Sequence, residues 1–104
     1  MQERLKMNFE LLFTEDADDQ LTVLENSPSK KGVYKAVAKT LRFMETNLRH
    51  PSINTHAYES ISGPNREKIF ESYAQNNTPG AYRVFWYYGP KKSQICILAI
   101  IPHP

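Results

Sequence analysis

The chain carries one arginine in a setting where a charge is costly. Arg83 interrupts the segment A-Y-R-V-F-W-Y-Y at 81–88, in which every other residue is apolar or aromatic. A charge in such a strand needs a charged partner, hydrogen bonds or a bound anion. One interpretation is an ion pair with a carboxylate, such as that of Glu71 on the preceding strand. The other is a clamp for a phosphate, flanked by aromatic rings on which the bases of single-stranded RNA could stack.

Three histidines are candidates for proton transfer, because imidazole titrates near neutral pH. His103 follows the last apolar segment in I-I-P-H-P, and His50 and His56 lie in the polar stretch L-R-H-P-S-I-N-T-H. A single histidine near a chain end is also often an ordinary surface residue. With Arg83, these groups could cleave RNA without a metal: a base takes the 2′-hydroxyl proton, cations stabilise the charged phosphorus centre, and an acid protonates the leaving oxygen.

Other kinds of chemistry lack the residues that they need. The spacing of His50 and His56 does not match the i, i+4 pair of a helical metal site, and a single cysteine provides no zinc cluster. The sequence contains no glycine-rich phosphate loop, no G-x-S-x-G elbow and no Cys–His signature. We therefore expect neither a metal nor a cofactor. Cys96, between two isoleucines, is expected to pack in the core.

Length and composition predict one small domain that covers residues 1–104. The chain is 40% hydrophobic and 23% charged, which is typical of a globular protein rather than a disordered one. A single cysteine fits a reducing compartment. No apolar run approaches the roughly 20 residues of a membrane span, and the N-terminal residues lack a signal-peptide pattern. The sequence therefore predicts a cytoplasmic protein that has no membrane partner.

Charge is distributed unevenly along the chain, although the net charge is only +2. Residues 1–26 contain two basic and seven acidic residues, whereas residues 27–104 contain eleven basic and four acidic ones. The acidic residues that follow Thr14 suit the positive end of a helix dipole. The basic remainder indicates an anionic partner such as nucleic acid, or simply a soluble surface.

Two helices are expected after a first strand at 7–13. The first begins after Thr14, which is a good N-cap, and the second begins at Ser27–Pro28. Apolar residues recur at helical spacing from 33 to 48, which is the strongest periodicity in the chain. This stretch carries basic residues on its opposite side, which are either a solvated helix face or a surface that follows a phosphate backbone. These residues are Lys31, Lys35, Lys39 and Arg42.

The last forty residues predict an antiparallel meander of strands joined by short turns. Alternation along the strand at 81–88 places Tyr82 and Arg83 on opposite faces. The predicted fold is α+β with the order β-α-α-β-β-β, in which one antiparallel sheet has two helices packed on one face. Strands are expected at 69–75, 81–88 and 94–101, turns at 63–65, 76–80 and 89–92, and a short extended piece at 58–61.

This order of elements and three motifs together resemble the RelE/ParE superfamily of bacterial toxins. The motifs are R-H-P-S-I-N-T-H after the second helix, A-Y-R-V-F-W-Y-Y in the penultimate strand and I-L-A-I-I-P-H-P at the end. The resemblance extends over residues 7–104. It implies a RelE-like fold and, for the RelE branch, the toxin of a type II toxin–antitoxin system. Such a toxin is an endonuclease that cleaves mRNA in the ribosomal A site and is neutralised by a cognate antitoxin protein.

The resemblance also implies roles for individual residues. Arg83 looks like the strand arginine that contacts the scissile phosphate, and His103 looks like the histidine that follows the last strand and transfers a proton. His50 and His56 lie in the loop that often keeps basic or imidazole groups beside the active site. Contacts to mRNA and ribosomal RNA are expected from Lys35, Lys39, Arg49, Tyr82, Lys91 and Lys92.

The sequence departs from the pattern of some RelE-type toxins in one stretch. Those toxins carry a pair of lysines or a glutamate just before the second strand, where this chain has Ser52, Asn54 and Glu59. Two alternatives to an mRNA endonuclease therefore stay open. One is a ParE-like toxin that inhibits DNA gyrase without nuclease activity, and the other is a non-toxic interaction protein with a RelE-like fold.

Overall fold

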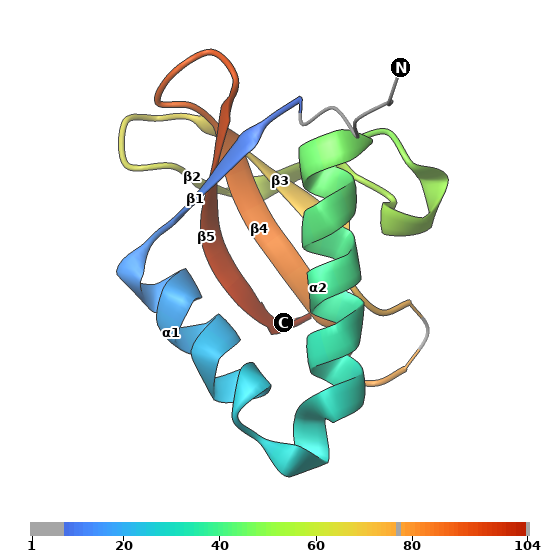
Figure 1. The fold of residues 1–104 in the computed structure, drawn as a ribbon. Coiled ribbons are helices and arrows are strands. Elements are labelled where there is room, and N and C mark those ends of the chain that lie inside the picture. Colours follow the sequence, from blue (N-terminus) through green and yellow to red (C-terminus); the bar gives the residue numbers. More distant parts are fainter. Residues whose placement is uncertain (1–7, 77, 104) are drawn as a thin grey trace, which may run out of the picture.

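A five-stranded sheet and two α-helices make up the computed structural model, which describes residues 8–76 and 78–103 (Figure 1). Met7 of the predicted first strand and Asn77 of a predicted turn lie outside the described residues. The elements are β1 (Glu10–Phe13), α1 (Glu15–Glu25), α2 (Lys31–Thr46), β2 (His56–Ser62), β3 (Lys68–Tyr73), β4 (Tyr82–Tyr88) and β5 (Gln94–Pro102), with short 3-10 turns at Pro28–Lys30 and Pro51–Ile53.

The predicted α+β class is confirmed, but the sheet is mixed rather than wholly antiparallel. Its strand order is β1-β5-β4-β3-β2, and β1 pairs with β5 in parallel while all other neighbours are antiparallel. The predicted hairpins β3–β4 and β4–β5 are present, and the extended piece expected at 58–61 is a full strand, β2. β1 pairs with β5, the last strand of the described chain, so no local turn signal encodes their relative direction.

Both helices pack against one face of the sheet through apolar stripes. Helix α1 begins where expected, because the Thr14 side chain accepts a hydrogen bond from the Ala17 backbone N–H at 3.1 Å. Met44 of α2 and Trp86 of β4 are fully buried in the core between the helices and the sheet. The Trp86 indole also donates a hydrogen bond to Ser72 at 2.9 Å, which satisfies its buried N–H.

The substitution Met44→Ala tests this core. We expect it to lower the free energy of unfolding by about 2–5 kcal/mol, because it removes a fully buried side chain and leaves a cavity. Val23→Ala on the exposed side of α1 is the control, expected within about 0.5 kcal/mol of the parent protein. Urea denaturation measures both. Equal, small effects would contradict the packing of α2 on the sheet.

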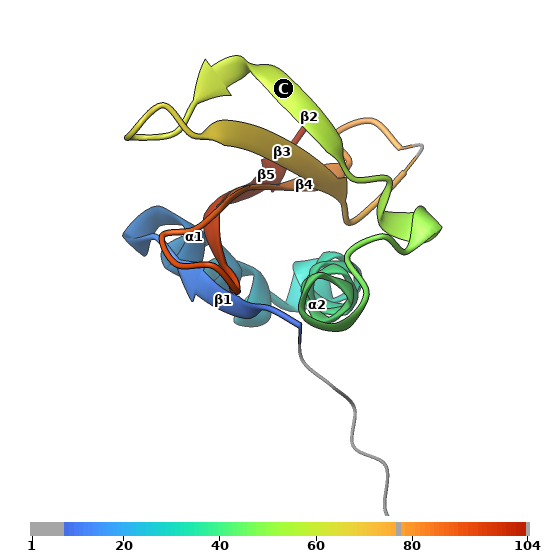
Figure 2. The same cartoon turned by 90° about the horizontal axis from the view of Figure 1, so that it is seen from above.

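The opposite face of the sheet is covered by no helix in the described part of the chain. Seen from above, the sheet curves from β1 beside the helices to β2 on the side away from α2 (Figure 2). A smaller apolar cluster occupies this face, and it includes Phe85, Tyr87 and Cys96. Cys96 is therefore buried as expected. Alternation along β4 places Arg83 on this same helix-free face, beside Phe85.

Candidate functional site

Four charged or titratable side chains meet on the helix-free face, around the carboxylate of Glu71. They come from successive strands: His56 from β2, Glu71 from β3, Arg83 from β4, and His103 from the residue that follows β5. His56 and Glu71 are direct cross-strand partners, and Arg83 lies opposite Tyr73, two residues further along β3. We call His56, Glu71, Arg83 and His103 the Glu71 cluster.

Glu71 is the centre of this cluster. Only 3% of its side chain is exposed, yet both carboxylate oxygens have polar partners. Oε1 lies 2.8 Å from Nε2 of His56, and Oε2 lies 3.2 Å from Nδ1 of His103 and 3.4 Å from Nε of Arg83. A buried carboxylate is costly unless it is paired in this way. The arrangement therefore depends on Glu71 being held by positive or proton-donating groups.

Arg83 is held on three sides. Its guanidinium lies over the Tyr73 ring, 3.6 Å from the ring centroid, and Nη1 donates to the carbonyls of Gln75 and Tyr82. Nε is buried and makes no hydrogen bond to any residue that the structure describes, and it faces Glu71 at ion-pair distance. The ion pair with Glu71, one of the two interpretations of the sequence, is therefore present.

The two histidines of the cluster reach the surface beside this buried pair. The side chains of His56 and His103 are 41% and 49% exposed. Nδ1 of His56 lies 2.7 Å from the carbonyl oxygen of Asn54, so both of its ring nitrogens face acceptors. The backbone N–H of His103 donates to the carbonyl of Ala81 at 2.7 Å, which holds His103 beside the start of β4. Exposed imidazoles next to a charged pair can exchange protons with a bound ligand.

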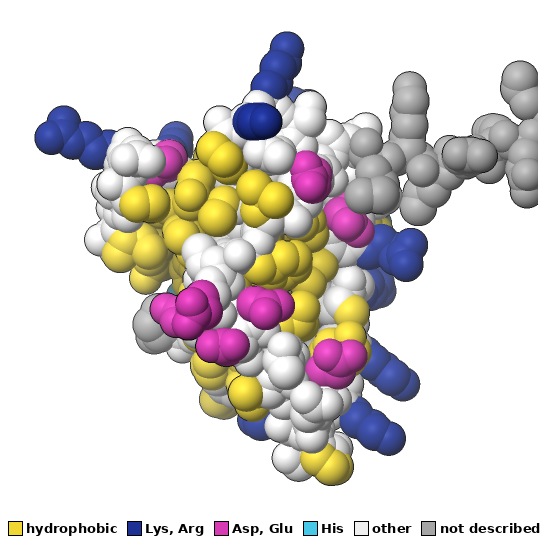
Figure 3. Space-filling model, turned by 60° about the vertical axis from the view of Figure 1, so that its left-hand side comes forward, with side chains coloured by type: hydrophobic (Ala, Val, Ile, Leu, Met, Phe, Trp, Pro, Cys, Tyr) yellow, Lys and Arg dark blue, Asp and Glu magenta, His cyan; other side chains and the backbone are white. Residues whose placement is uncertain are grey.

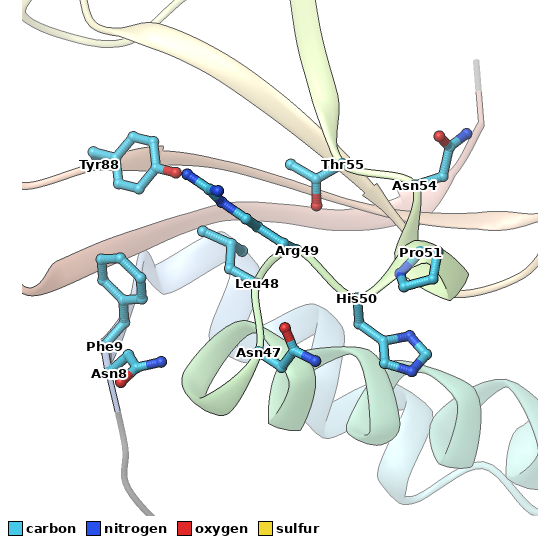
Figure 4. Close-up of a pocket in the computed structure, with 10 residues that line it drawn as sticks. All are labelled: Asn8, Phe9, Asn47, Leu48, Arg49, His50, Pro51, Asn54, Thr55 and Tyr88. Carbon is cyan, nitrogen blue, oxygen red and sulfur yellow. The ribbon is translucent and has the colours of Figure 1, made fainter.

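His50, the third histidine, lies apart from the Glu71 cluster. Its Nδ1 accepts a hydrogen bond from the Ser52 backbone N–H at 3.1 Å and lies 2.7 Å from the Ser52 hydroxyl. Its ring stacks on Phe43 of α2 with a centroid separation of 4.0 Å. In Figure 4 the ring points over α2, whereas the neighbouring Arg49 extends toward Tyr88. His50 thus caps the turn at Pro51–Ile53.

The residues predicted to bind RNA fall in three places. Arg49 lines a groove of about 660 Å³ with Tyr88 and Phe9 (Figure 4), and Lys91 and Lys92 line an adjoining hollow that shares Phe9. This end of β4 is opposite to the end that carries Arg83. Lys35 and Lys39 are exposed on α2, and Tyr82 is half-buried on the helix-packed face, where Lys30 lies over its ring.

Two contacts of the Glu71 cluster were not predicted from the sequence. Glu71 is predicted only as a partner of Arg83, although its carboxylate also contacts both histidines. The ring of Tyr73 packs against the guanidinium, a contact that was not predicted, whereas Tyr82 lies on the face opposite to Arg83, as the alternation predicts. A signal for Glu71 exists in the sequence, since it is an isolated charge in the apolar strand I-F-E-S-Y, as Arg83 is in its own strand.

Tyr87, which lies on the same face of β4 as Arg83, is not suited to act as a base. A hydrogen bond with Cys96 and burial raise the pKa of Tyr87 to about 12, so its hydroxyl keeps its proton at neutral pH. The described residues contain no group of three or more His, Cys, Asp or Glu side chains placed to hold a metal ion. No described helix is both long and apolar enough to cross a membrane.

Solved toxin structures share this fold. The YoeB toxin of Staphylococcus aureus, solved as a dimer, aligns with 93% of this chain and 99% of its own, with a TM-score of 0.66 and 11% identity. A YoeB/ParE toxin of Agrobacterium tumefaciens aligns with 92% of this chain and 100% of its own, with a TM-score of 0.67 and 6% identity. For the archaeal RelE–RelB complex of Pyrococcus horikoshii the shares are 92% and 96%, with a TM-score of 0.61 and 15% identity.

The likeness is one of fold and extends over nearly the whole chain in each case. No family model matches the sequence, and no curated protein matches it significantly. The chain has the fold of the RelE/ParE toxins, as its sequence motifs predict. At these identities the chemistry has to be argued from its own residues.

Proposed function

We propose that this chain, built on the RelE/ParE toxin fold, is the toxin of a type II toxin–antitoxin pair and cleaves mRNA on the ribosome. The observation that carries the proposal is the Glu71 cluster on the helix-free face, where Arg83 and two exposed imidazoles all contact the Glu71 carboxylate. These are the groups needed for metal-independent attack of a ribose 2′-hydroxyl on the adjacent phosphate. The imidazoles transfer protons, and Arg83 supplies positive charge beside the phosphate.

Exposed basic side chains away from the cluster support an RNA partner. Lys35 and Lys39 project from α2, and Arg49, Lys91 and Lys92 surround the grooves at the far end of β4. Cations spread over several faces suit contacts to the phosphate backbone of a large RNA. In this proposal ribosomal RNA holds the protein through these residues, and the mRNA in the A site meets the Glu71 cluster.

An apolar groove between α1 and β5 is the proposed site for the antitoxin. The groove has a volume of about 270 Å³ and is lined by Val23, Ile100 and Ile101, with Asp19 at its border. Figure 3 shows acidic side chains gathered beside a broad hydrophobic surface. A partner segment that has apolar side chains flanked by basic ones would complement both the apolar groove and the acidic side chains beside it. The solved RelE–RelB complex supports the presence of such a partner.

The substitution Val23→Asp tests the groove. Val23 is 63% exposed, so the change leaves the fold intact while it places a charge against the apolar part of the partner. We expect binding of the antitoxin encoded beside this gene to weaken by about tenfold or more, as measured by calorimetry. Thr22→Asp, which adds the same charge outside the groove, is the control. Equal affinity for both variants would place the antitoxin elsewhere.

Controlled expression separates the proposed activity from its alternatives. An mRNA endonuclease arrests growth and creates new transcript ends within minutes of induction, while chromosomal DNA stays intact. A gyrase inhibitor would instead cause DNA damage without new transcript ends. Normal growth of cells that accumulate the folded protein would favour a non-toxic interaction protein.

A further inference from the structure

We infer that the groove beside Tyr88 binds an unpaired nucleotide of single-stranded RNA, with the base stacked on the Tyr88 ring and the phosphates held by cations at the rim. The Tyr88 groove, as we call it, comprises the groove lined by Arg49, Tyr88 and Phe9 and the adjoining hollow that shares Phe9. The inference rests on the RNA partner of the proposed function, but binding can be measured without cleavage. The site is separate from the Glu71 cluster, because Tyr88 follows Arg83 by five residues on β4, about 17 Å, and lies on the opposite face with Trp86.

Tyr88 is an exposed aromatic ring that its neighbours hold in place. Half of the residue is exposed, although it ends a strand whose preceding residues are buried. Its ring lies edge-on to Trp86 and Phe70, with centroid separations of 4.9 and 5.3 Å, and tilted to Phe9 at 5.9 Å. A ring that is already fixed loses little conformational entropy when a base stacks on it. Tyr88 is therefore suited to be a stacking platform.

The Tyr88 groove has room for a nucleotide and polar groups that can hydrogen-bond to one. Its two parts have volumes of about 660 and 470 Å³, and sites for small molecules typically have about 300–1,000 Å³. The backbone N–H of Phe9 donates to the Glu45 carbonyl at 3.2 Å, which fixes the wall between the two parts against the end of α2. The amides of Asn47 and Asn54 also line the groove, and an amide can both donate to and accept from a base edge.

Positive charge prevails around the Tyr88 groove. Among the described residues that line it, the charged ones are Arg49, Lys91, Lys92 and Glu10. Arg49 is exposed, makes no ion pair with any described residue and extends toward Tyr88 (Figure 4). The Glu10 carboxylate already accepts a hydrogen bond from the Gln94 side chain at 2.9 Å, across the pairing of β1 with β5. The excess of cations favours an occupant that carries phosphates.

A fixed aromatic ring beside cations is the combination that recognises unpaired nucleotides. The ring stacks on the face of a base, while the cations contact the phosphates on either side of it. A duplex hides the faces of its bases, so the ring selects a single strand. Because every base has an aromatic face, stacking on Tyr88 accepts any base, and the Tyr88 groove therefore recognises an unpaired nucleotide rather than a particular sequence.

Fluorescence anisotropy with a short labelled single-stranded RNA tests the stacking platform. We expect Tyr88→Ala to weaken binding roughly 5–150-fold, the usual effect of removing one base–aromatic stack. Tyr88→Phe keeps the ring and should bind like the parent protein. Phe13→Ala, which removes an exposed ring from the other end of β1, is the matched control and should also bind like the parent. Unchanged affinity of a folded Tyr88→Ala variant would overturn the inference.

Two further measurements separate the base from the phosphates. With the unaltered protein, an RNA of the same length whose bases have been removed should bind as weakly as intact RNA binds to Tyr88→Ala. Arg49→Ala should reduce the slope of log affinity against log salt concentration by about 0.7, the contribution of one phosphate contact in a single strand. Lys31→Ala, at the opposite end of α2, is the control for this slope. Equal binding of the intact and the base-free RNA would refute stacking in the Tyr88 groove.

The outcome for the Tyr88 groove is distinguishable from the outcome for the proposed function. If RNA binding shows the expected losses but the protein does not cleave mRNA on the ribosome, the proposed activity fails and the nucleotide site stands. If the protein cleaves mRNA while neither Tyr88→Ala nor removal of the bases changes binding, the activity stands and the nucleotide site fails.

Discussion

Replacing Arg83 by glutamine will reduce RNA cleavage by roughly 10²–10³-fold, the loss typical when one donor to a developing negative charge is removed. The guanidinium shares the Glu71 carboxylate with both exposed imidazoles and is fixed by the Tyr73 ring and two backbone carbonyls, so in the proposed function its position is set before RNA binds. Arg83→Lys keeps the charge but loses the planar group that stacks on Tyr73. It should retain a part of the activity.

Stability must be measured beside activity, because Arg83 also neutralises a buried carboxylate. Breaking a buried ion pair on one side costs about 3–5 kcal/mol. The double variant Arg83→Gln/Glu71→Gln removes both charges and should recover much of that loss, as followed by thermal unfolding. It should remain inactive. A folded double variant that cleaves RNA at the wild-type rate would show that neither residue serves the reaction.

If the proposed cleavage holds, replacing His103 by alanine will lower the cleavage rate by roughly 10²–10⁴-fold, the usual contribution of a group that transfers a proton. Its side chain is about half exposed, so the free energy of unfolding should change by less than about 1 kcal/mol. Single-turnover cleavage of a ribosome-bound message measures the loss. The effect should be on the chemical step rather than on binding.

His50→Ala is the matched control for His103→Ala. His50 caps a turn and stacks on Phe43, so its loss should lower stability while cleavage by the folded protein continues. A pattern in which His50→Ala abolishes cleavage and His103→Ala does not would contradict the assignment of the site to the Glu71 cluster.

Much of the fold could be predicted, because local patterns encode local structure. The apolar spacing from 33 to 48 predicts α2, and the turn residues at 76–80 and 89–92 predict the two hairpins that the structure contains. The position and direction of β1 could not be predicted. It pairs with β5, which follows it by more than eighty residues, so no local sequence pattern encodes the pairing.

The candidate site was partly predictable for a similar reason. Arg83 is conspicuous as a lone charge in an aromatic strand, and His103 follows directly from the end of β5. His56 joins them because the register between β2 and β3 pairs it with Glu71. His50 does not join them, because it precedes β2 and caps the turn at Pro51–Ile53. β2 is polar and its register shifts between Ala57 and Ser62, so no simple alternation marks its inner face.

The most direct test of the proposed activity uses the purified protein, translating ribosomes and a defined mRNA. We expect cleavage within the A-site codon, a 2′,3′-cyclic phosphate on the upstream fragment and a 5′-hydroxyl on the downstream one. The same reaction with His103→Ala should leave the message intact. If the wild-type protein leaves the ribosome-bound message intact but stops DNA supercoiling by gyrase, the Glu71 cluster is not a nuclease site and the gyrase alternative holds.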